Sequence, residues 1–415
     1  MAHTPSTTAP AHPLAGVSPD VLTVTNLIRT GRAVTRQAIA EATGMGRNTV
    51  SVLINDAVDA GLLTPNGSAP STGGRAPATW RFRAEAGLAL AIGVHTTTLR
   101  LAVADLSGAT LVSEVVDWPI ARGPEATLAE AAARLRVLLA RAEKDWPAHG
   151  QVRVAGISLT GPVDRHSGRP IAPPIMPGWD GFDVVGTVQA LLGVPVVVDN
   201  DVNVMLTGFL AAAAERQDMS EDLLYVQVGT GIGAGLLASG RIHHGADGAA
   251  GDIGHVRVTT SDQVICRCGR TGCLEAVAGG WAVLRDARRA ANDGVSPFLR
   301  GRLEQAGELS IEDVITGVAA GDTECLTLTV RSATAVGDAL AMLVSLLNPA
   351  RVVLAGPMPQ ACPIFLEVAQ RIVKERALGL ATRNLRISVT SEGLEDERRG
   401  AAVLAVSALF DGARR

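Results

Sequence analysis

The feature that most constrains the fold of this chain is a change of hydrophobic pattern near residue 88. Before it, apolar residues recur at helical spacing; after it, short apolar runs alternate with long Ala-rich helical segments. Strands alternating with helices are typical of the α/β class, and 415 residues suffice for two or three domains. The predicted strands are 88–94, 99–104, 110–116, 152–159, 194–198, 223–229, 233–239, 351–355 and 385–391. The main predicted helices are 124–145, 202–214, 322–348, 361–377 and 398–410.

Residues 18–63 predict three helices. Ser18 and Thr35 are suitable N-caps for the first two, and Gly44 would turn the chain into the third, which runs from about Arg47 to Ala60. Two short strands follow at 62–64 and 79–82, with Pro-Asn-Gly as the turn. Together these elements predict a winged helix-turn-helix DNA-binding domain over residues 18–84, and an ordinary three-helix subdomain is the alternative.

The charge distribution agrees with a DNA-binding head. Residues 1–83 contain seven arginines, no lysine and four acids, a net +3, whereas the whole chain carries −4. In the third predicted helix, polar side chains face away from the apolar stripe and are candidates to contact DNA: Arg47, Asn48, Thr49, Ser51 and Asn55. Arg75, in a Gly- and Pro-rich linker, is a candidate for the minor groove or simply a solvated residue.

The first 17 residues are rich in Thr and Pro and predict a disordered tail without the features of a signal peptide. No apolar run approaches the ~18–20 residues that span a membrane. We therefore expect a cytoplasmic protein with no membrane partner.

Three of the five cysteines lie within eight residues, in the pattern His255-x10-Cys266-x-Cys268-x4-Cys273. Three thiolates and one imidazole complete a tetrahedral shell without an open position, so we predict structural Zn²⁺. Three free cysteines in a loop are the alternative. Cys325 and Cys362 fall on apolar helix faces and are expected to be inert core residues.

The strings GAAGDIGHVRV (248–258) and CRCGRTGCLE (266–275) resemble the signature of the ROK family of repressors, open reading frames and sugar kinases. The resemblance implies an actin-like ROK domain of two lobes, with a sugar in the cleft and a structural zinc ion beside it. We assign 88–198 with 395–415 to lobe 1 and 199–394 to lobe 2. The helix-turn-helix extension is similar to that of the family's regulators.

The resemblance also implies sugar-binding residues. Asn200 and Asp201 match the pair that holds the sugar hydroxyls, and in the kinases the residue matching Asp201 is the catalytic base. His255 would bind zinc through one ring nitrogen and the sugar through the other, and Glu275 matches a second sugar carboxylate. Asp252 stands where the family usually has Glu, one methylene longer.

Kinase activity is not expected, because the ATP phosphate loop is degraded. In ROK kinases the first phosphate loop reads Asp-x-Gly-x-Thr, and Gly93 and His95 stand here in place of the Asp and the Gly. A second loop, Gly229 to Gly235, is intact, but Pro357 removes a backbone donor from the adenosine-side loop. No catalytic residue is therefore assigned, unless the chain is a kinase with Asp201 as its base.

The sequence thus predicts a sugar-responsive DNA-binding transcriptional regulator, most simply a repressor of carbohydrate-metabolism genes. A ROK-type sugar kinase with an appended DNA-binding domain is the alternative, and a sugar-binding scaffold whose head binds another protein is a third. One head makes few base contacts, so we expect a homodimer or homotetramer on an inverted-repeat DNA operator.

Overall fold

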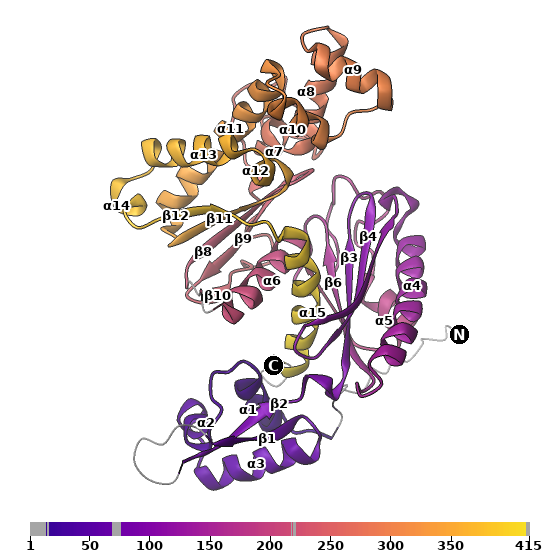
Figure 1. The fold of residues 1–415 in the computed structure, drawn as a ribbon, viewed down its shortest axis with the longest axis vertical. Helices are drawn as coiled ribbons and strands as arrows, with labels where there is room; N and C mark the ends of the chain where they lie inside the picture. Colours follow the sequence, from indigo (N-terminus) through magenta and orange to yellow (C-terminus); the bar gives the residue numbers. More distant parts are fainter. Residues whose placement is uncertain (1–13, 15, 69–75, 217, 219–220, 412–415) are drawn as a thin grey trace, which may run out of the picture. The chain divides into compact units, whose positions relative to one another are not determined.

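The computed structural model describes residues 14, 16–68, 76–216, 218 and 221–411 and confirms the α/β architecture. The chain forms two compact units (Figure 1). Unit 1 comprises residues 1–160, 182–199 and 398–415, and unit 2 comprises 161–181 and 200–397. The segment 161–181 therefore groups with unit 2.

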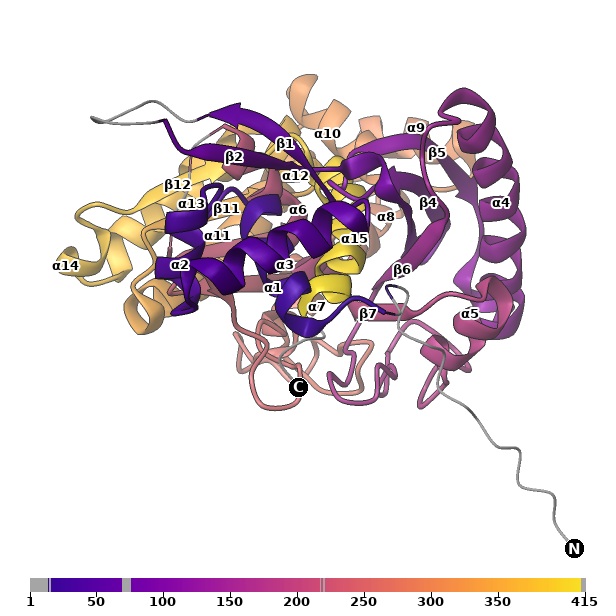
Figure 2. The same cartoon turned by 90° about the horizontal axis from the view of Figure 1, so that it is seen from below.

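Unit 1 begins with the predicted three-helix head and its hairpin, which can be followed in Figure 2. The elements are α1 Pro19–Arg29, α2 Arg36–Thr43, α3 Arg47–Asp59, β1 Leu63–Ser68 and β2 Ala78–Phe82. Ser18 and Thr35 cap α1 and α2 through their side chains, and Gly44 ends α2 at φ 72°. A bridge from Thr35 to Thr79 ties the hairpin to the start of α2, which gives the arrangement of a winged helix.

Two details of the head differ from the sequence prediction. Pro65, Asn66 and Gly67 lie inside β1 instead of forming the turn, and the pairing with β2 is irregular between Pro65 and Ser68. Leu14, expected in a disordered tail, is buried in the core of the head. Arg75 lies outside the described residues.

The rest of unit 1 is a five-stranded sheet in the order β5-β4-β3-β6-β7. Its strands are β3 Leu88–Val94, β4 Thr98–Asp105, β5 Thr110–Asp117, β6 Val152–Leu159 and β7 Val196–Asn200. The other elements are η1 Ala84–Ala86, η2 Ile120–Arg122, α4 Pro124–Asp145 and α5 Val184–Leu192. Strands β5, β4 and β3 form an antiparallel meander, and β6 continues the sheet parallel to β3.

The head shares one hydrophobic core with this sheet and with helix α15 (Gly393–Asp411). Phe82 of β2 meets Phe410 of α15 edge to face, with ring centroids 5.7 Å apart, and the Arg29 guanidinium lies over the same Phe410 ring. Against the sheet, α15 approaches so closely that a Cβ on Gly156 would lie 2.1 Å from the Ala401 carbonyl oxygen. The head is therefore packed against the rest of unit 1 and is not an independent domain joined to it only by a linker.

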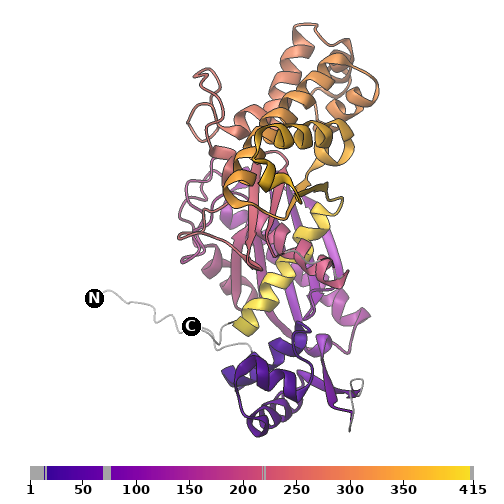
Figure 3. The same cartoon turned by 90° about the vertical axis from the view of Figure 1, so that its left-hand side faces the viewer.

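Unit 2 contains the second sheet, in the order β10-β9-β8-β11-β12, with helices that can be followed in Figure 3. The strands are β8 Leu223–Val228, β9 Ile232–Ala238, β10 Arg241–Ile242, β11 Arg351–Ala355 and β12 Arg386–Val389. The helices are α6 Asp201–Glu215, η3 Ile253–His255, α7 Leu274–Ala278, α8 Gly280–Asn292, α9 Pro297–Ala306, α10 Ile311–Ala319, α11 Thr323–Leu347, α12 Pro357–Ala361, α13 Pro363–Arg376 and α14 Gly379–Thr382. Strand β8 pairs in parallel with β11 and antiparallel with β9.

Helix α11 corrects the expectation that no segment is long and apolar enough to cross a membrane. By length and composition α11 passes that test, the only helix in the described part of the chain to do so. Leu328, Val336 and Leu340 of α11 are nevertheless buried in the core of unit 2, where the helix packs against α13 and α7. Helix α11 is therefore placed as the core helix of a globular unit.

Candidate functional site

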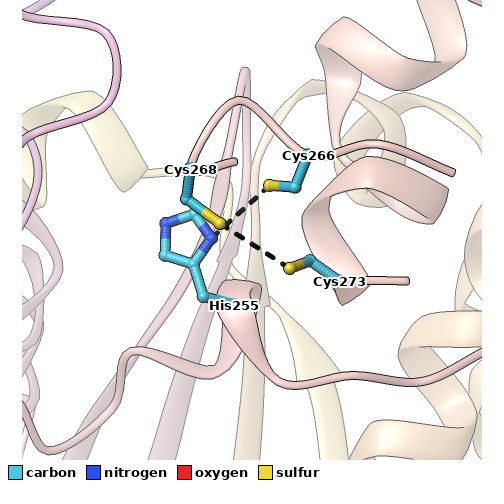
Figure 4. A group of neighbouring side chains, drawn as sticks. All are labelled: His255, Cys266, Cys268 and Cys273. Atoms are coloured by element: carbon cyan, nitrogen blue, oxygen red, sulfur yellow. Dashed lines mark hydrogen bonds between the residues drawn. The ribbon is translucent and has the colours of Figure 1, made fainter. Parts of the chain in front are cut away.

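The structure brings the four predicted metal ligands together in unit 2 (Figure 4). His255 ends the short helix η3, Cys266 and Cys268 lie in the following loop, and Cys273 caps the start of α7. The four potential ligand atoms all lie within 4.8 Å of one another, with His255 Nδ1 3.6 Å from Cys266 Sγ and Cys268 Sγ 3.8 Å from Cys273 Sγ. The cluster could therefore hold a metal ion.

These spacings can be compared with those of a tetrahedral zinc centre. Zn–S bonds of about 2.3 Å and a Zn–N bond of about 2.0–2.1 Å place neighbouring donors roughly 3.5–3.8 Å apart. The two measured separations fall in that range. The backbone supports the same arrangement, because Leu274 N donates to the Val256 carbonyl and Arg257 bridges Cys273.

The thiols of the cluster differ in acidity. Burial raises the pKa of Cys266 to about 12 and also raises the pKa of Cys273. At Cys268 burial acts in the same direction, but hydrogen bonds with Arg270 outweigh it and lower the pKa to about 7. One thiol is therefore ready to ionise near neutral pH, and binding of a metal cation would favour the thiolate form of the other two.

Glu275 links the cluster to the glycine-rich turn between β8 and β9. It is the second residue of α7 and two positions after Cys273; its Oε2 accepts a hydrogen bond from Ile232 N at 3.2 Å, and its Oε1 accepts one from Trp281 Nε1 at 3.2 Å. A Cβ on Gly231 would lie 2.4 Å from Glu275 Oε2, so a larger residue at this position would displace the carboxylate. Both carboxylate oxygens are thus oriented by the fold.

Trp281 is a member of this site that the sequence reasoning missed. The guanidinium of Arg267, which lies between two of the cysteines, stands 4.7 Å from the Trp281 ring centroid, and Arg285 stands 5.3 Å from it. Trp281 N also donates to the Thr230 carbonyl. No sequence motif that we identified pointed to this residue, because its role depends on the contact between α8 and the glycine turn.

Asn200 and Asp201 lie where β7 passes into α6, as the sequence predicted. Asn200 caps α6: its Oδ1 accepts from Val202 N at 3.0 Å and its Nδ2 donates to the Gly161 carbonyl at 2.8 Å. Asp201 Oδ1 also accepts from Val202 N, at 2.9 Å. Val202 in turn lies against Gly233 of β9, just after the glycine turn that Glu275 contacts.

Asp252 is the N-cap residue of η3, three positions before His255, and is exposed. Glu275 approaches the same short helix, because a Cβ on Gly254 would lie 3.4 Å from its Oε2. Asp252, His255 and Glu275 therefore all belong to one neighbourhood around η3 and the start of α7. Carboxylates and an imidazole so arranged can accept and donate several directional hydrogen bonds to a hydroxylated ligand.

Gly93 and His95, which the sequence comparison with ROK kinases predicts to stand at phosphate-loop positions, lie in unit 1. Gly93 is buried inside β3, paired with Arg100 of β4, and His95 follows directly in the β3–β4 turn. His95 Nε2 lies 3.1 Å from Arg100 Nη1. Because an arginine can only donate, Nε2 is the acceptor in this hydrogen bond, which places an imidazole and a guanidinium in this turn.

The candidate DNA-contacting residues occupy α3 in the head. Arg47, Asn48, Thr49 and Asn55 are exposed, whereas Ser51 is half-buried and its hydroxyl donates to the Arg47 carbonyl at 2.8 Å. The opposite face of α3 carries the predicted apolar stripe, with Val50, Leu53 and Ile54 buried. Helix α3 therefore presents a polar face outward on a packed scaffold.

Comparison with known proteins identifies the family. The ROK family model matches residues 88–408, so the chain belongs to the ROK family, as the motifs predicted. The xylose repressor of Caldicellulosiruptor bescii is 25% identical over 89% of this chain and 90% of its own length. A glucokinase of Halalkalibacterium halodurans is 32% identical over 48% of this chain and 60% of its own.

Among solved structures, a ROK family transcriptional regulator described as a homologue of the Escherichia coli Mlc protein superposes with a TM-score of 0.78. It is 21% identical and the match covers 95% of this chain and 96% of that one. The match extends over the head as well as the ROK domain, and it supports the predicted fold of both.

Proposed function

We propose that this protein is a sugar-responsive, DNA-binding transcriptional repressor that controls genes of carbohydrate metabolism. The observation that carries the proposal is that a winged helix and a ROK domain occur in one chain and share one hydrophobic core. The match with the xylose repressor spans 89% of this chain, whereas the match with the glucokinase spans 48% of it. A head so firmly packed is suited to transmit a change of state in the ROK domain.

The residues proposed to bind the sugar are Asn200, Asp201, Asp252, His255 and Glu275. Sugars are recognised by many directional hydrogen bonds, and each group left unpaired costs about 1–3 kcal/mol. Glu275 and Asn200 suit this role because backbone contacts already fix their orientation. His255 would use Nδ1 for the metal and leave Nε2 for a sugar hydroxyl.

The proposed metal is Zn²⁺, held by His255, Cys266, Cys268 and Cys273. A closed shell of three thiolates and one imidazole makes it a structural ion, which would link the loop at 266–268 to η3 and α7. Its proposed effect on the sugar site is positional, because His255 and Glu275 both lie within two residues of the cluster or belong to it.

The proposed DNA-binding residues are Arg47, Asn48, Thr49, Ser51 and Asn55, with Arg75 as a candidate minor-groove contact. Arginine matches guanine and asparagine matches adenine in the major groove. A homodimer or homotetramer would place two heads on an inverted repeat, in the cytoplasm where the chromosome lies. Consider one conformation of the protein that binds the operator and another that does not. Sugar binding can change operator affinity by no more than the difference between the sugar's affinities for these two conformations.

A sugar kinase with an appended head is the second candidate. It is favoured by the presence of Asp201 and of the glycine turn after β8. It is opposed by Gly93 inside β3 and by His95 in the turn that follows. Phosphoryl transfer depends on positioned phosphates and Mg²⁺, and an imidazole beside a guanidinium offers no ligand of the usual kind for that metal.

The test combines three measurements on the zinc-loaded protein. A thermal-shift screen of common sugars first names the ligand class, and a gel shift on the promoter region of the protein's own gene then measures DNA binding with and without that sugar. A coupled assay for ADP with ATP and Mg²⁺ runs in parallel. The proposal expects a sugar-dependent gel shift and no ADP; sugar-dependent ADP formation without DNA binding would contradict it.

A further inference from the structure

Helix α3, the proposed DNA-recognition helix, carries one apolar residue that lies outside the hydrophobic core. Val52, in the middle of α3, is 58% exposed. Within the described part of the head, the other large aliphatic residues of α1 and α3 are buried or partly buried, including Val50, Leu53 and Ile54 of the same helix. Val52 thus makes little contribution to the core.

Val52 lies on the same face of α3 as the polar residues that are proposed to contact DNA. Residues three and four apart share a helix face, so Val52 lies in one row with Asn48 and Thr49 before it and Asn55 and Asp56 after it, all of them exposed. Valine is also a poorer helix former than alanine, so an exposed valine is not explained by the stability of α3. The side chain lies in the centre of the face that we assign to the major groove.

The charges on α3 indicate which end of that face approaches DNA. Arg47 begins the helix, whereas Asp56 and Asp59 are exposed near its end. Carboxylates are repelled by the phosphate backbone, so the first half of the helix is the half suited to enter the groove. Val52 lies at the end of this first half, near the midpoint of α3, and shares a helix face with the hydrogen-bonding side chains of Asn48 and Thr49.

In the major groove the only apolar group on an unmodified base pair is the C5-methyl of thymine. We propose that Val52 reads a thymine methyl group in each operator half-site. This inference rests on the proposed DNA-binding function and adds to it a base and a residue. Val52 would contribute sequence preference through contact of its γ-methyls with that group, next to the hydrogen bonds made by its polar neighbours.

The test breaks the proposed methyl contact from either side, by removing the C5-methyl of thymine or the γ-methyls of Val52. An operator is first selected by the full-length protein from randomised duplexes, and each thymine of one half-site is then replaced singly by deoxyuridine. Operator affinity is measured by fluorescence anisotropy at one salt concentration for wild type and for Val52→Ala. Because Val52 is exposed and alanine favours helix, the variant is expected to fold, which its thermal melt checks.

At one thymine position, methyl removal should weaken wild-type binding about three- to tenfold, the scale of one lost methyl contact, and weaken Val52→Ala less than twofold. Val115→Ala, which changes an equally exposed valine on β5, is the matched control and should keep the wild-type response.

Equal losses for wild type and Val52→Ala at every thymine would overturn the inference and leave the proposed repressor function standing. Failure to select any duplex above non-specific binding would overturn both.

Discussion

Helix α3, which we propose to contact DNA, and the neighbourhood of the Cys3His cluster use polar residues in opposite ways. On α3, Arg47, Asn48 and Asn55 are exposed and stand on a helix that the core holds from behind. In unit 2, Glu275 is bonded to the backbone at Ile232 and to Trp281, and Asn200 to the backbone at Gly161. Substitutions on α3 should therefore act singly and leave the fold intact, whereas substitutions around the cluster should affect neighbours as well.

The largest expected effect comes from breaking the cluster. Cys268→Ser should reduce bound zinc from about one ion per chain to near zero and should lower both the thermal midpoint and the response to sugar, because metal binding and local folding are one equilibrium. Elemental analysis of protein purified without chelator measures the metal. Cys325→Ala, a buried cysteine outside the cluster, is the control and should retain zinc; a full complement in Cys268→Ser would contradict the assignment.

The contact between the head and α15 should come next. Phe410→Ala removes a buried ring that packs on Phe82 and beneath Arg29, so we expect a loss of about 3–5 kcal/mol in the free energy of unfolding of unit 1. Denaturant titration followed by circular dichroism measures it. Val137→Ala, an exposed position on α4, should cost little. A loss below about 1 kcal/mol for Phe410→Ala would show that the shared core does not hold the head.

Asp201→Asn tests the sugar site. A carboxylate that accepts a sugar hydroxyl makes a charge-assisted hydrogen bond, and its loss should weaken sugar binding by about 1–3 kcal/mol, roughly five- to 150-fold. Operator binding without sugar should stay near the wild-type value. Calorimetric titration with the sugar measures the affinity, and Glu308→Gln, an exposed carboxylate elsewhere in unit 2, serves as the matched change. Unchanged sugar affinity would remove Asp201 from the proposed site.

Arg47→Ala is expected to have the most confined effect. If Arg47 makes one bidentate contact with guanine, operator affinity should fall by about 1–3 kcal/mol while zinc content and sugar affinity do not change. Arg141→Ala removes the same charge from an exposed site on α4 and controls for net charge. Equal operator affinity of both variants at matched salt would exclude Arg47 from the base-contacting residues.

The contrast between the two regions also explains what the sequence could predict. The helices of the head follow from local signals, since the Ser18 and Thr35 caps and the turn at Gly44 act within a few residues. The spacing of His255 and the three cysteines was equally informative, because a metal site imposes its donor set on the sequence. The Pro65–Gly67 turn was predicted wrongly, because pairing with β2 overrode the local preference of these residues.

Contacts between distant segments were out of reach of the sequence. The role of Trp281 depends on α8 packing under the glycine turn, and the burial of Leu14 and Phe410 depends on the head meeting the sheet and α15. Helix α11 was predicted as a helix, but its place in the core of unit 2 depends on its packing against α13 and α7. Such features arise from tertiary packing and have no signature in a short window of sequence.

The proposed repressor function depends most on one coupling, in which a sugar bound in the ROK domain changes how the head binds DNA. The direct measurement is the operator dissociation constant of the wild-type protein, determined by fluorescence anisotropy across a titration of the sugar that the thermal-shift screen identifies. We expect operator affinity to fall as the sugar concentration rises, and Asp201→Asn to need a higher concentration for the same fall. An operator affinity that stays constant while the sugar demonstrably binds would contradict it.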